Sequence, residues 1–461
     1  MSMDLAPHDI DGRIAQAAAH WRSAVRKLRR DPDASRRNVL EGHRAVATRS
    51  MWVELGERGV KDPVLAAART WVYALTLERV CWSWRVSVFE KLHAQHILVP
   101  DLEPGRLSLR TVLDRILCEA EPGRRRDYAI AFENEARHMR SLGIVLAERR
   151  AEATTALGAR QLKDNTEVPL DPPAALFDIV KRVLELTEPF VPRGHRRWEE
   201  VIASGLARDA GEGWPAQLSV RWLAELFGPT GLLKGVGLPA IDLPKPTGAV
   251  SFVRALALFG QVYAETDVSS SAPFVFKRSP FDLRVARRAA LFGTLPFDPV
   301  FGVRVLNLGR ARAMDQARQI ARALIVTLRM DALRVLLRGQ EELSFSARED
   351  RFQQLTEQTM GVPFSPNLEF VLPTSSPLDP TRFLGTLLGV ADRRSLIERF
   401  DEDWFRSPHA IEAIRSEQAE LPLKKDTTLD AQPVFLPFRT TEKEVDAALL
   451  DLGRLLAVLF G

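Results

Sequence analysis

The chain has 461 residues, more than one hydrophobic core usually takes, so two helical subdomains or one large body with a cleft are expected. Its 46% hydrophobic and 27% charged residues are typical of a globular protein and exclude a disordered one. The formal net charge is only +4, and 53 of the 64 basic residues are arginines with acids nearby, so nucleic-acid binding is not favoured.

Helical periodicity runs along most of the chain. The segment 63–97 begins with Asp62 and Pro63, an N-cap followed by a proline at the first helical position, which predicts a long, mostly buried helix. Short extended pieces at 272–277 and 368–373 are the only candidate strands. Apolar spacing predicts further helices over 11–50 with a break at 31–33, 107–120, 124–158, 173–188, 195–208, 219–228, 249–265, 281–294, 298–340, 346–360, 379–401, 407–417 and 442–460.

These elements predict an all-α fold, a large two-lobed helical body with at most a small β element. A proline-bounded stretch at 166–176 marks the expected internal boundary, because prolines hold the chain extended and end the preceding helix. We therefore predict an N-terminal helical subdomain over 1–165 and a second helical subdomain over 170–461.

The two cysteines, Cys81 and Cys118, lie in apolar helical contexts and indicate neither a disulfide framework nor a zinc ribbon. The first residues carry acids and lack the apolar segment of a secretory signal. No apolar run approaches the roughly 20 residues that span a membrane. The sequence thus predicts a cytoplasmic protein without a membrane span.

Two Glu-x-x-His pairs, Glu90 with His93 and Glu135 with His138, lie on predicted helices. Residues three apart project from one helix face, and two such pairs are typical of di-iron carboxylate bundles. A bundle also needs a lone glutamate on each of two further helices, and the interval between the pairs is too short for one of these. A metal site built from these four residues, with His96 as an additional candidate, is one alternative.

The stretch 256–265, LALFGQVYAE, resembles the zinc-binding helix of the thimet oligopeptidase and oligoendopeptidase F family. That family has approximately His-Glu-Phe-Gly-His-Ala-Tyr/Leu there, and Phe259, Gly260 and Tyr263 match in register. Ala257 and Gln261 stand at the positions of the histidine ligands, and Leu258 stands at that of the general base. A plain core helix without peptidase ancestry is the alternative interpretation.

The resemblance extends diffusely over residues 170–420. Residues 278–292 are similar to the family's third-ligand helix but carry arginines, Arg287 among them, where a glutamate is expected. Residues 384–414 resemble its closing segment. The chain also has no tyrosine after Tyr263 and no histidine between His195 and His409, although family members use such residues to hold the peptide.

The resemblance implies a body of the zinc oligopeptidase type. Because neither alanine, leucine nor glutamine is a good zinc ligand, we expect no zinc, no cofactor and no peptidase activity. We predict a non-catalytic protein whose cleft, lined by Ala257, Leu258, Gln261, Tyr263 and Arg287, binds a peptide or protein partner. The expected role is that of a regulatory or companion subunit, in a homo- or hetero-oligomer. Besides the metal site, an Arg-rich helical scaffold for acidic partners is a further alternative.

Overall fold

The computed structural model describes residues 6–31, 37–99, 102–158, 167–191, 194, 197–206, 213–214, 219–233, 249–266, 272–338, 345–372, 376–419 and 438–461. The structure is 79% helical. Its sheet is a single parallel pair of two-residue strands, β1 (Leu170–Asp171) and β2 (Thr440–Thr441). The predicted all-α class with at most a small β element is therefore confirmed.

The N-terminal helices begin where the sequence carries start signals. The carboxylate of Asp62 accepts the backbone N–H groups of Val64 and Leu65, and Pro63 is the first helical residue, as predicted. The elements of this part are α1 (Pro7–Arg30), η2 (Val39–Val46), α2 (Arg49–Arg58), α3 (Pro63–His93), α4 (Leu109–Cys118) and α5 (Pro122–Ala156).

Twelve further α-helices are described after β1. They are α6 (Leu176–Thr187), α7 (Trp198–Leu206), α8 (Val220–Phe227), α9 (Ala249–Thr266), α10 (Phe274–Lys277), α11 (Leu283–Gly293), α12 (Pro299–Arg304), α13 (Arg310–Leu336), α14 (Phe345–Met360), α15 (Asp379–Phe400), α16 (Pro408–Ala419) and α17 (Glu442–Phe460). The one helix expected over 298–340 is in fact two, because Asn307 has a φ of 55° and Gly309 is an extended N-cap.

Both predicted strands are wrong. Residues 274–277 form α10, whose first N–H groups, those of Phe274 and Val275, donate to the carboxylate of Asp11 in α1 at 2.9 Å each. In the second segment a 3-10 turn, η8 (Pro366–Leu368), is followed by further turns. The contact with Asp11 of α1 explains why the first segment is a helix.

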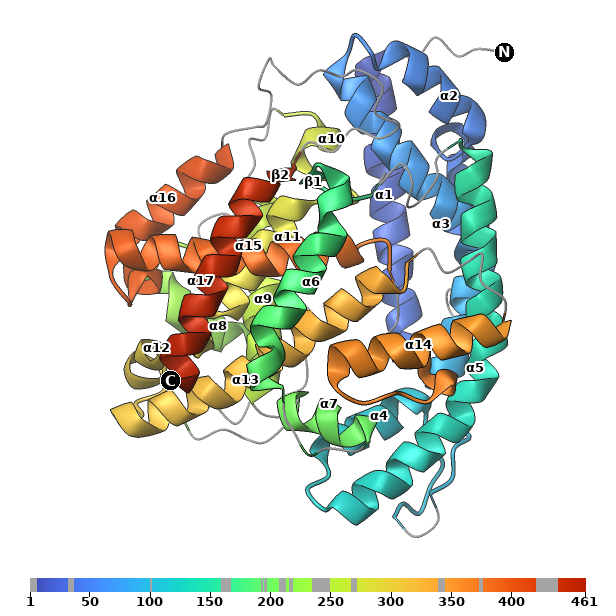
Figure 1. Cartoon of the computed structure of the whole chain (residues 1–461). Helices are drawn as coiled ribbons and strands as arrows, with labels where there is room; N and C mark the ends of the chain where they lie inside the picture. Colours follow the sequence, from blue (N-terminus) through green and yellow to red (C-terminus); the bar gives the residue numbers. More distant parts are fainter. Residues whose placement is uncertain are drawn as a thin grey trace.

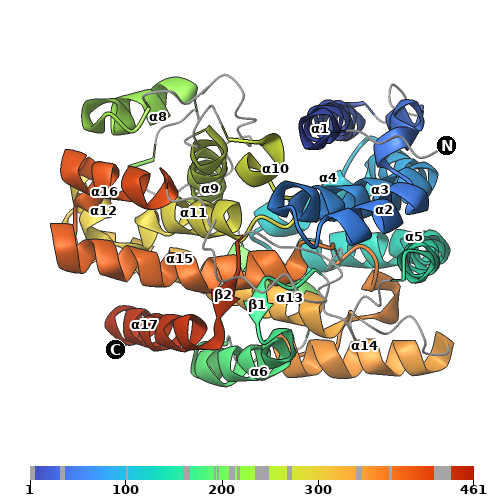
Figure 2. The same ribbon diagram turned by 90° about the horizontal axis from the view of Figure 1, so that it is seen from above.

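Helices α1–α5 gather on one side of the molecule, and α8, α9, α11, α12 and α15–α17 gather on the other (Figures 1 and 2). In Figure 2, α14 lies along the lower edge of the view and α13 lies between it and the early helices. Helix α10 lies between α9 and α1 in the same view. Helix α11 packs against both α9 and α15. The side formed by the later helices therefore has α11 at its centre.

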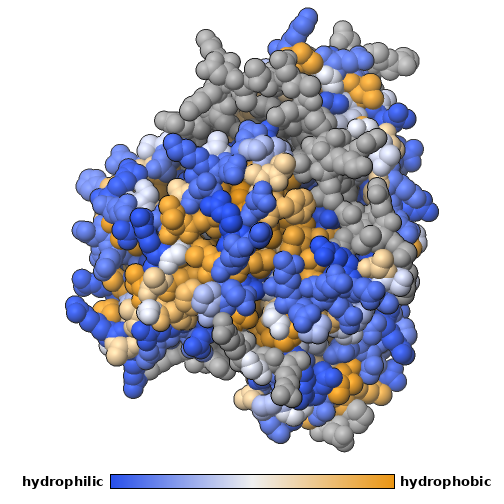
Figure 3. Space-filling model, in the orientation of Figure 1, coloured by the Kyte–Doolittle hydropathy of each residue, from blue (hydrophilic) through white to orange (hydrophobic). Residues whose placement is uncertain are grey.

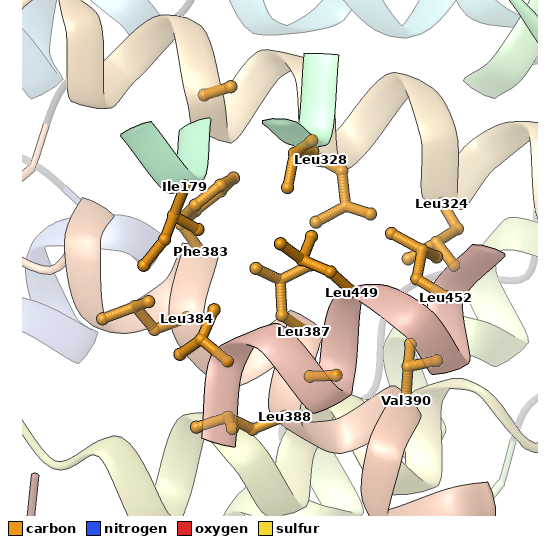
Figure 4. Packing of buried hydrophobic residues seen from close by; sticks show 14 of the residues in the cluster. Ile179, Leu324, Leu328, Phe383, Leu384, Leu387, Leu388, Val390, Leu449 and Leu452 are labelled. Carbon is orange, nitrogen blue, oxygen red and sulfur yellow. The ribbon is translucent and has the colours of Figure 1, made fainter. Parts of the chain in front are cut away.

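The largest apolar cluster joins α6, α13, α15 and α17. Leucine, isoleucine, valine and phenylalanine side chains from these four helices point toward one another (Figure 4). The labelled members are Ile179, Leu324, Leu328, Phe383, Leu384, Leu387, Leu388, Val390, Leu449 and Leu452. Burial of this apolar surface fixes the platform on which α11 and α9 lie.

A second cluster draws on both sides of the predicted boundary at 166–176. It contains Phe132 of α5, Trp198 of α7, Met330 of α13 and Phe352 of α14, all buried. The division into 1–165 and 170–461 stays a prediction, and this cluster shows that the two parts share apolar contacts.

Glu167 is a buried charged link between the two parts. Its carboxylate accepts hydrogen bonds from Tyr73 at 3.0 Å and Arg150 at 2.9 Å, and it pairs with Arg338 after α13. Burial acts to raise the pKa of Glu167, but the two guanidinium groups outweigh it and hold that pKa below its usual value. The group is therefore a buried anion held by cations from both parts.

Hydrophobic side chains gather across the middle of the face seen in Figure 3, where α6 and α17 lie. Phe177 of α6 and Leu450 and Val458 of α17 are among the exposed large hydrophobic residues.

In the part of the chain that the structure describes, none of the helices combines the length and the apolar character needed to cross a membrane.

Candidate functional site

Helix α9 has a buried face and an outward face. The buried residues include Ala255, Leu256, Phe259, Gly260, Tyr263 and Ala264. We call the opposite stripe the outward face of α9; its residues, exposed or half-buried, are Arg254, Ala257, Leu258, Gln261, Val262 and Glu265. Their spacing of three and four places them along one side of the helix.

The residues that match the oligopeptidase pattern are buried core residues. Phe259 stacks on Phe227 with ring centroids 4.5 Å apart, and Tyr263 is fully buried in the same aromatic cluster. A Cβ on Gly260 would lie 2.4 Å from the carbonyl oxygen of Arg288 in α11, so the approach of the two helices requires glycine. These three residues position α9 against α11.

The residues that differ from the oligopeptidase pattern belong to the outward face of α9. Ala257 is half-buried against Gly293 of α11, and Leu258 packs at the edge of the aromatic cluster. Gln261 is exposed and donates from Nε2 to Oε1 of Glu265 at 3.4 Å. Of these three neighbouring residues, Gln261 is exposed, whereas Ala257 and Leu258 are half-buried against α11 and the aromatic cluster.

These residues do not fit a zinc ion. Two aliphatic side chains supply no ligand, and a glutamine amide is a poor one. Across the described ranges, no group of three or more His, Cys, Asp and Glu side chains could hold a metal ion. The chemistry available on the outward face is apolar contact and amide hydrogen bonding.

Arg287 belongs to the contact between α11 and α15. Its Nε donates to Oδ2 of Asp392 at 2.7 Å, and Arg288 beside it pairs with Glu417 at 3.2 Å. Burial acts to lower the pKa of Arg287, and Asp392 more than offsets this, so the pKa is raised. Arg287 is therefore a fixed structural cation that pairs with Asp392 of α15.

The two Glu-x-x-His pairs do not face one another across a shared metal position, because their members contact other residues. The Nδ1 of His93 lies 2.8 Å from the carbonyl oxygen of Phe89, in its own helix. Glu135 instead pairs with His96 at 2.6 Å. Together with His138, these two residues line a hollow of about 500 Å³ beside α5, which is also lined by Leu98 and Ile130.

At the C-terminal end of the outward face, charges from three elements meet. Arg278, just after α10, pairs with Glu265 at 3.6 Å, and its carbonyl oxygen accepts a hydrogen bond from Nε1 of Trp71 at 2.8 Å. The guanidinium carbon of Arg22 in α1 lies 5.7 Å from the centroid of the Trp71 ring. We call Arg22, Glu265 and Arg278 the charged end of the outward face.

Sequence reasoning missed Arg22 and Arg278. Each stands among many arginines, and neither has a local motif that distinguishes it. The two are 256 positions apart in the numbering, so only the fold reveals that they meet Glu265.

The sequence matches no family model and no curated protein. The solved structures that share its fold include two described as peptidases. One, a protein proposed to be an oligoendopeptidase F from Bacillus anthracis, has a TM-score of 0.54 and 11% identity, covering 91% of this chain and 84% of that chain. The other, PZ peptidase A with an inhibitor, has a TM-score of 0.58 and 9% identity, covering 92% of this chain and 85% of that chain.

This likeness, at such low identity, is one of fold, and it confirms the helical oligopeptidase architecture. It also corrects one expectation. The prediction that this chain is not an enzyme depended on the letters Ala257, Leu258 and Gln261, whereas both solved structures are described as peptidases. That prediction is wrong on this comparison, because the fold is one that peptidases use and one helix face does not decide the matter. The chain has the fold of oligoendopeptidase F and PZ peptidase.

Proposed function

We propose that this protein binds short peptides along the outward face of α9. The observation that carries the proposal is the position of Ala257, Leu258 and Gln261, which occupy the outward rather than the buried face of α9. The fold shared with two proteins described as peptidases supports peptides as the ligand class.

The side chains of this face suit a peptide chain. The amide of Gln261 has donors and an acceptor for a peptide backbone, and its hydrogen bond to Glu265 is long at 3.4 Å. Leu258 and Val262 are half-buried and supply apolar contact for a side chain of the ligand.

The length of the face sets the length of the ligand. From Arg254 to Glu265 the helix rises roughly 16 Å at 1.5 Å per residue. An extended peptide covers that distance with about five residues at 3.3–3.6 Å each. We therefore expect peptides of five residues or slightly more to bind better than dipeptides.

The test measures fluorescence anisotropy with a set of labelled peptides of two to eight residues. Replacing Gln261 by Lys (Q261K) places a longer, charged side chain on the face and is expected to weaken binding at least tenfold. The matched control, Q354K, makes the same change at an exposed position of α14 and leaves binding unchanged.

The proposal fails if the wild-type protein binds none of the peptides, or if Q261K and Q354K bind them equally well. Mass spectrometry of the same incubations, with and without added zinc, measures peptide-bond cleavage. Products that Q261K loses and Q354K retains would assign turnover to the same face and would support its role in binding.

A further inference from the structure

Two arginines and one carboxylate meet at the charged end of the outward face. Arg278 shares Glu265 with Gln261, which donates to the same carboxylate. Arg22 is half-buried, and within the described part of the chain its guanidinium makes neither a hydrogen bond nor an ion pair. One carboxylate thus faces two guanidinium groups.

The nearby acids do not fully offset the cost of burying the Arg22 guanidinium. Burial is the largest cause that lowers the pKa of Arg22, Glu265 acts in the opposite direction, and Arg278 lowers it further. Asp282 is the other acid that influences Arg22, but its carboxylate already accepts hydrogen bonds from Arg284 at 3.2 Å and from the N–H of Val285 at 3.2 Å. A second carboxylate near Arg22 would therefore be stabilised by both arginines.

We infer that Arg22 and Arg278 bind a carboxylate of the peptide ligand, namely its C-terminal carboxylate, at the end of α9 marked by Glu265. The inference rests on the proposed function, since the peptide must lie along the outward face of α9. It sets the direction of the ligand, whose C-terminus lies beside α1 and whose earlier residues contact Gln261 and Leu258.

The planar guanidinium groups suit this role. Arginine presents a fork of N–H donors that matches the two oxygens of a carboxylate, and such charge-assisted hydrogen bonds are about twice as strong as neutral ones. Arg278 is anchored by the hydrogen bond from Trp71 to its carbonyl oxygen, at 2.8 Å. Because Trp71 is buried, the backbone that carries one of the two cations is fixed.

The experiment compares three peptides that share one sequence without acidic residues, except that the third has glutamate at its last position. The first ends in a free carboxylate, the second ends in an amide, and the third has the amide end but carries glutamate as its last residue. Affinities are measured by isothermal titration calorimetry for the wild-type protein, for R22Q, and for R26Q, which removes the same charge one turn further along α1 at an exposed position.

We expect the wild-type protein to bind the free acid about tenfold more tightly than the amide, the size of one charge-assisted hydrogen bond. R22Q should abolish that preference, whereas R26Q should keep it. The amide with a terminal glutamate should bind like the plain amide; if it binds like the free acid, a side-chain carboxylate is the ligand and the assignment to the C-terminus is overturned.

Failures of the two proposals are distinguishable. Equal binding of acid and amide by the wild-type protein would overturn this inference and leave the proposed function intact. Absence of binding to all three peptides would overturn both. If R22Q weakened binding of acid and amide by the same factor, Arg22 would act only through the structure, and the inference would again be overturned.

Discussion

At the scale of single residues, Asp379 shows what burial does to an acid. Its side chain is fully buried at the start of α15 and accepts the N–H of Ser376 at 2.6 Å. Burial is the main cause that raises its pKa to about 6, against the lowering effects of that hydrogen bond and of Arg382 and Arg334. The folded protein therefore holds a proton here that the unfolded chain releases at lower pH.

The consequence is a loss of stability as the pH rises. The contribution of Asp379 is fully present below its unfolded pKa, near 3.8, and disappears as the pH passes its folded pKa of about 6. Between pH 5 and pH 7 the wild-type protein should lose about 1 kcal/mol more unfolding free energy than D379N. Denaturant titrations at both pH values measure this. D315N, which changes an exposed aspartate, should behave like the wild type, and parallel pH profiles for all three proteins would refute the prediction.

At the scale of elements, α11 is held between α9 and α15 by glycines. Gly260 of α9 faces the backbone of Arg288, while Gly385 and Gly389 of α15 lie against Ala286 and Ala290. Without side chains at these points the helix backbones approach closely, and burial of the surrounding apolar side chains stabilises the contact. The outward face of α9 therefore has a rigid support.

Replacing Gly260 by alanine tests this contact. The added Cβ would lie 2.4 Å from a backbone oxygen, so α9 must shift, at a cost of about 1–3 kcal/mol that exceeds the gain of up to about 1 kcal/mol in helix propensity. Calorimetry should show a lower Tm for G260A. The matched change G12A in α1 meets no atom within 4 Å and should raise the Tm. A higher Tm for both variants would show that the contact between α9 and α11 is looser than described.

At the scale of the whole molecule, the apolar cluster around Phe352 joins α4, α5, α7, α13 and α14. Buried Arg140 forms ion pairs with Glu349 and Glu369 across the same junction. Because the early and late helices share this cluster, neither part can lose its packing without exposing apolar surface of the other. We therefore expect unfolding of the two parts to be coupled.

The variant F352A removes a fully buried ring from this cluster and is expected to cost about 3–5 kcal/mol. Tryptophan fluorescence reports on Trp52, Trp71 and Trp82 in the early helices as well as on later ones, while circular dichroism reports on all helices. Both signals should shift to the same lower denaturant concentration. Two separated transitions, only one of which moves, would show independent domains.

Much of the helical architecture could be predicted from local signals. The start of α3 at Asp62 and Pro63 and the two faces of α9 follow from capping chemistry and from periodicity. The short helix α10 could not be predicted in this way, because the carboxylate that caps it, Asp11, is about 260 residues away in the chain. The break before α13 depends on the positive φ of Asn307, for which the sequence carries only a weak signal.

The candidate site likewise has one part that local sequence signals predict and one part that only the fold brings together. Gln261 follows Leu258 by three residues and Ala257 by four on one helix, so the neighbouring positions of these side chains were predictable. Arg22 and Arg278 come together only through the packing of α1 and α10 beside α9. Charged residues distant in sequence carry no periodic signal, which is why this part of the site needed the structure.

The buried Glu167 has a consequence for the order in which the molecule is made. Its partners Tyr73 and Arg150 precede it, but Arg338 is synthesised 171 residues later. At roughly 5–20 residues per second, the ribosome needs on the order of ten to thirty seconds to supply that arginine. During this interval the nascent N-terminal helices have Arg150 but lack the second of the two cations that hold their buried anion. Final closure of this junction therefore waits until Arg338 has been synthesised.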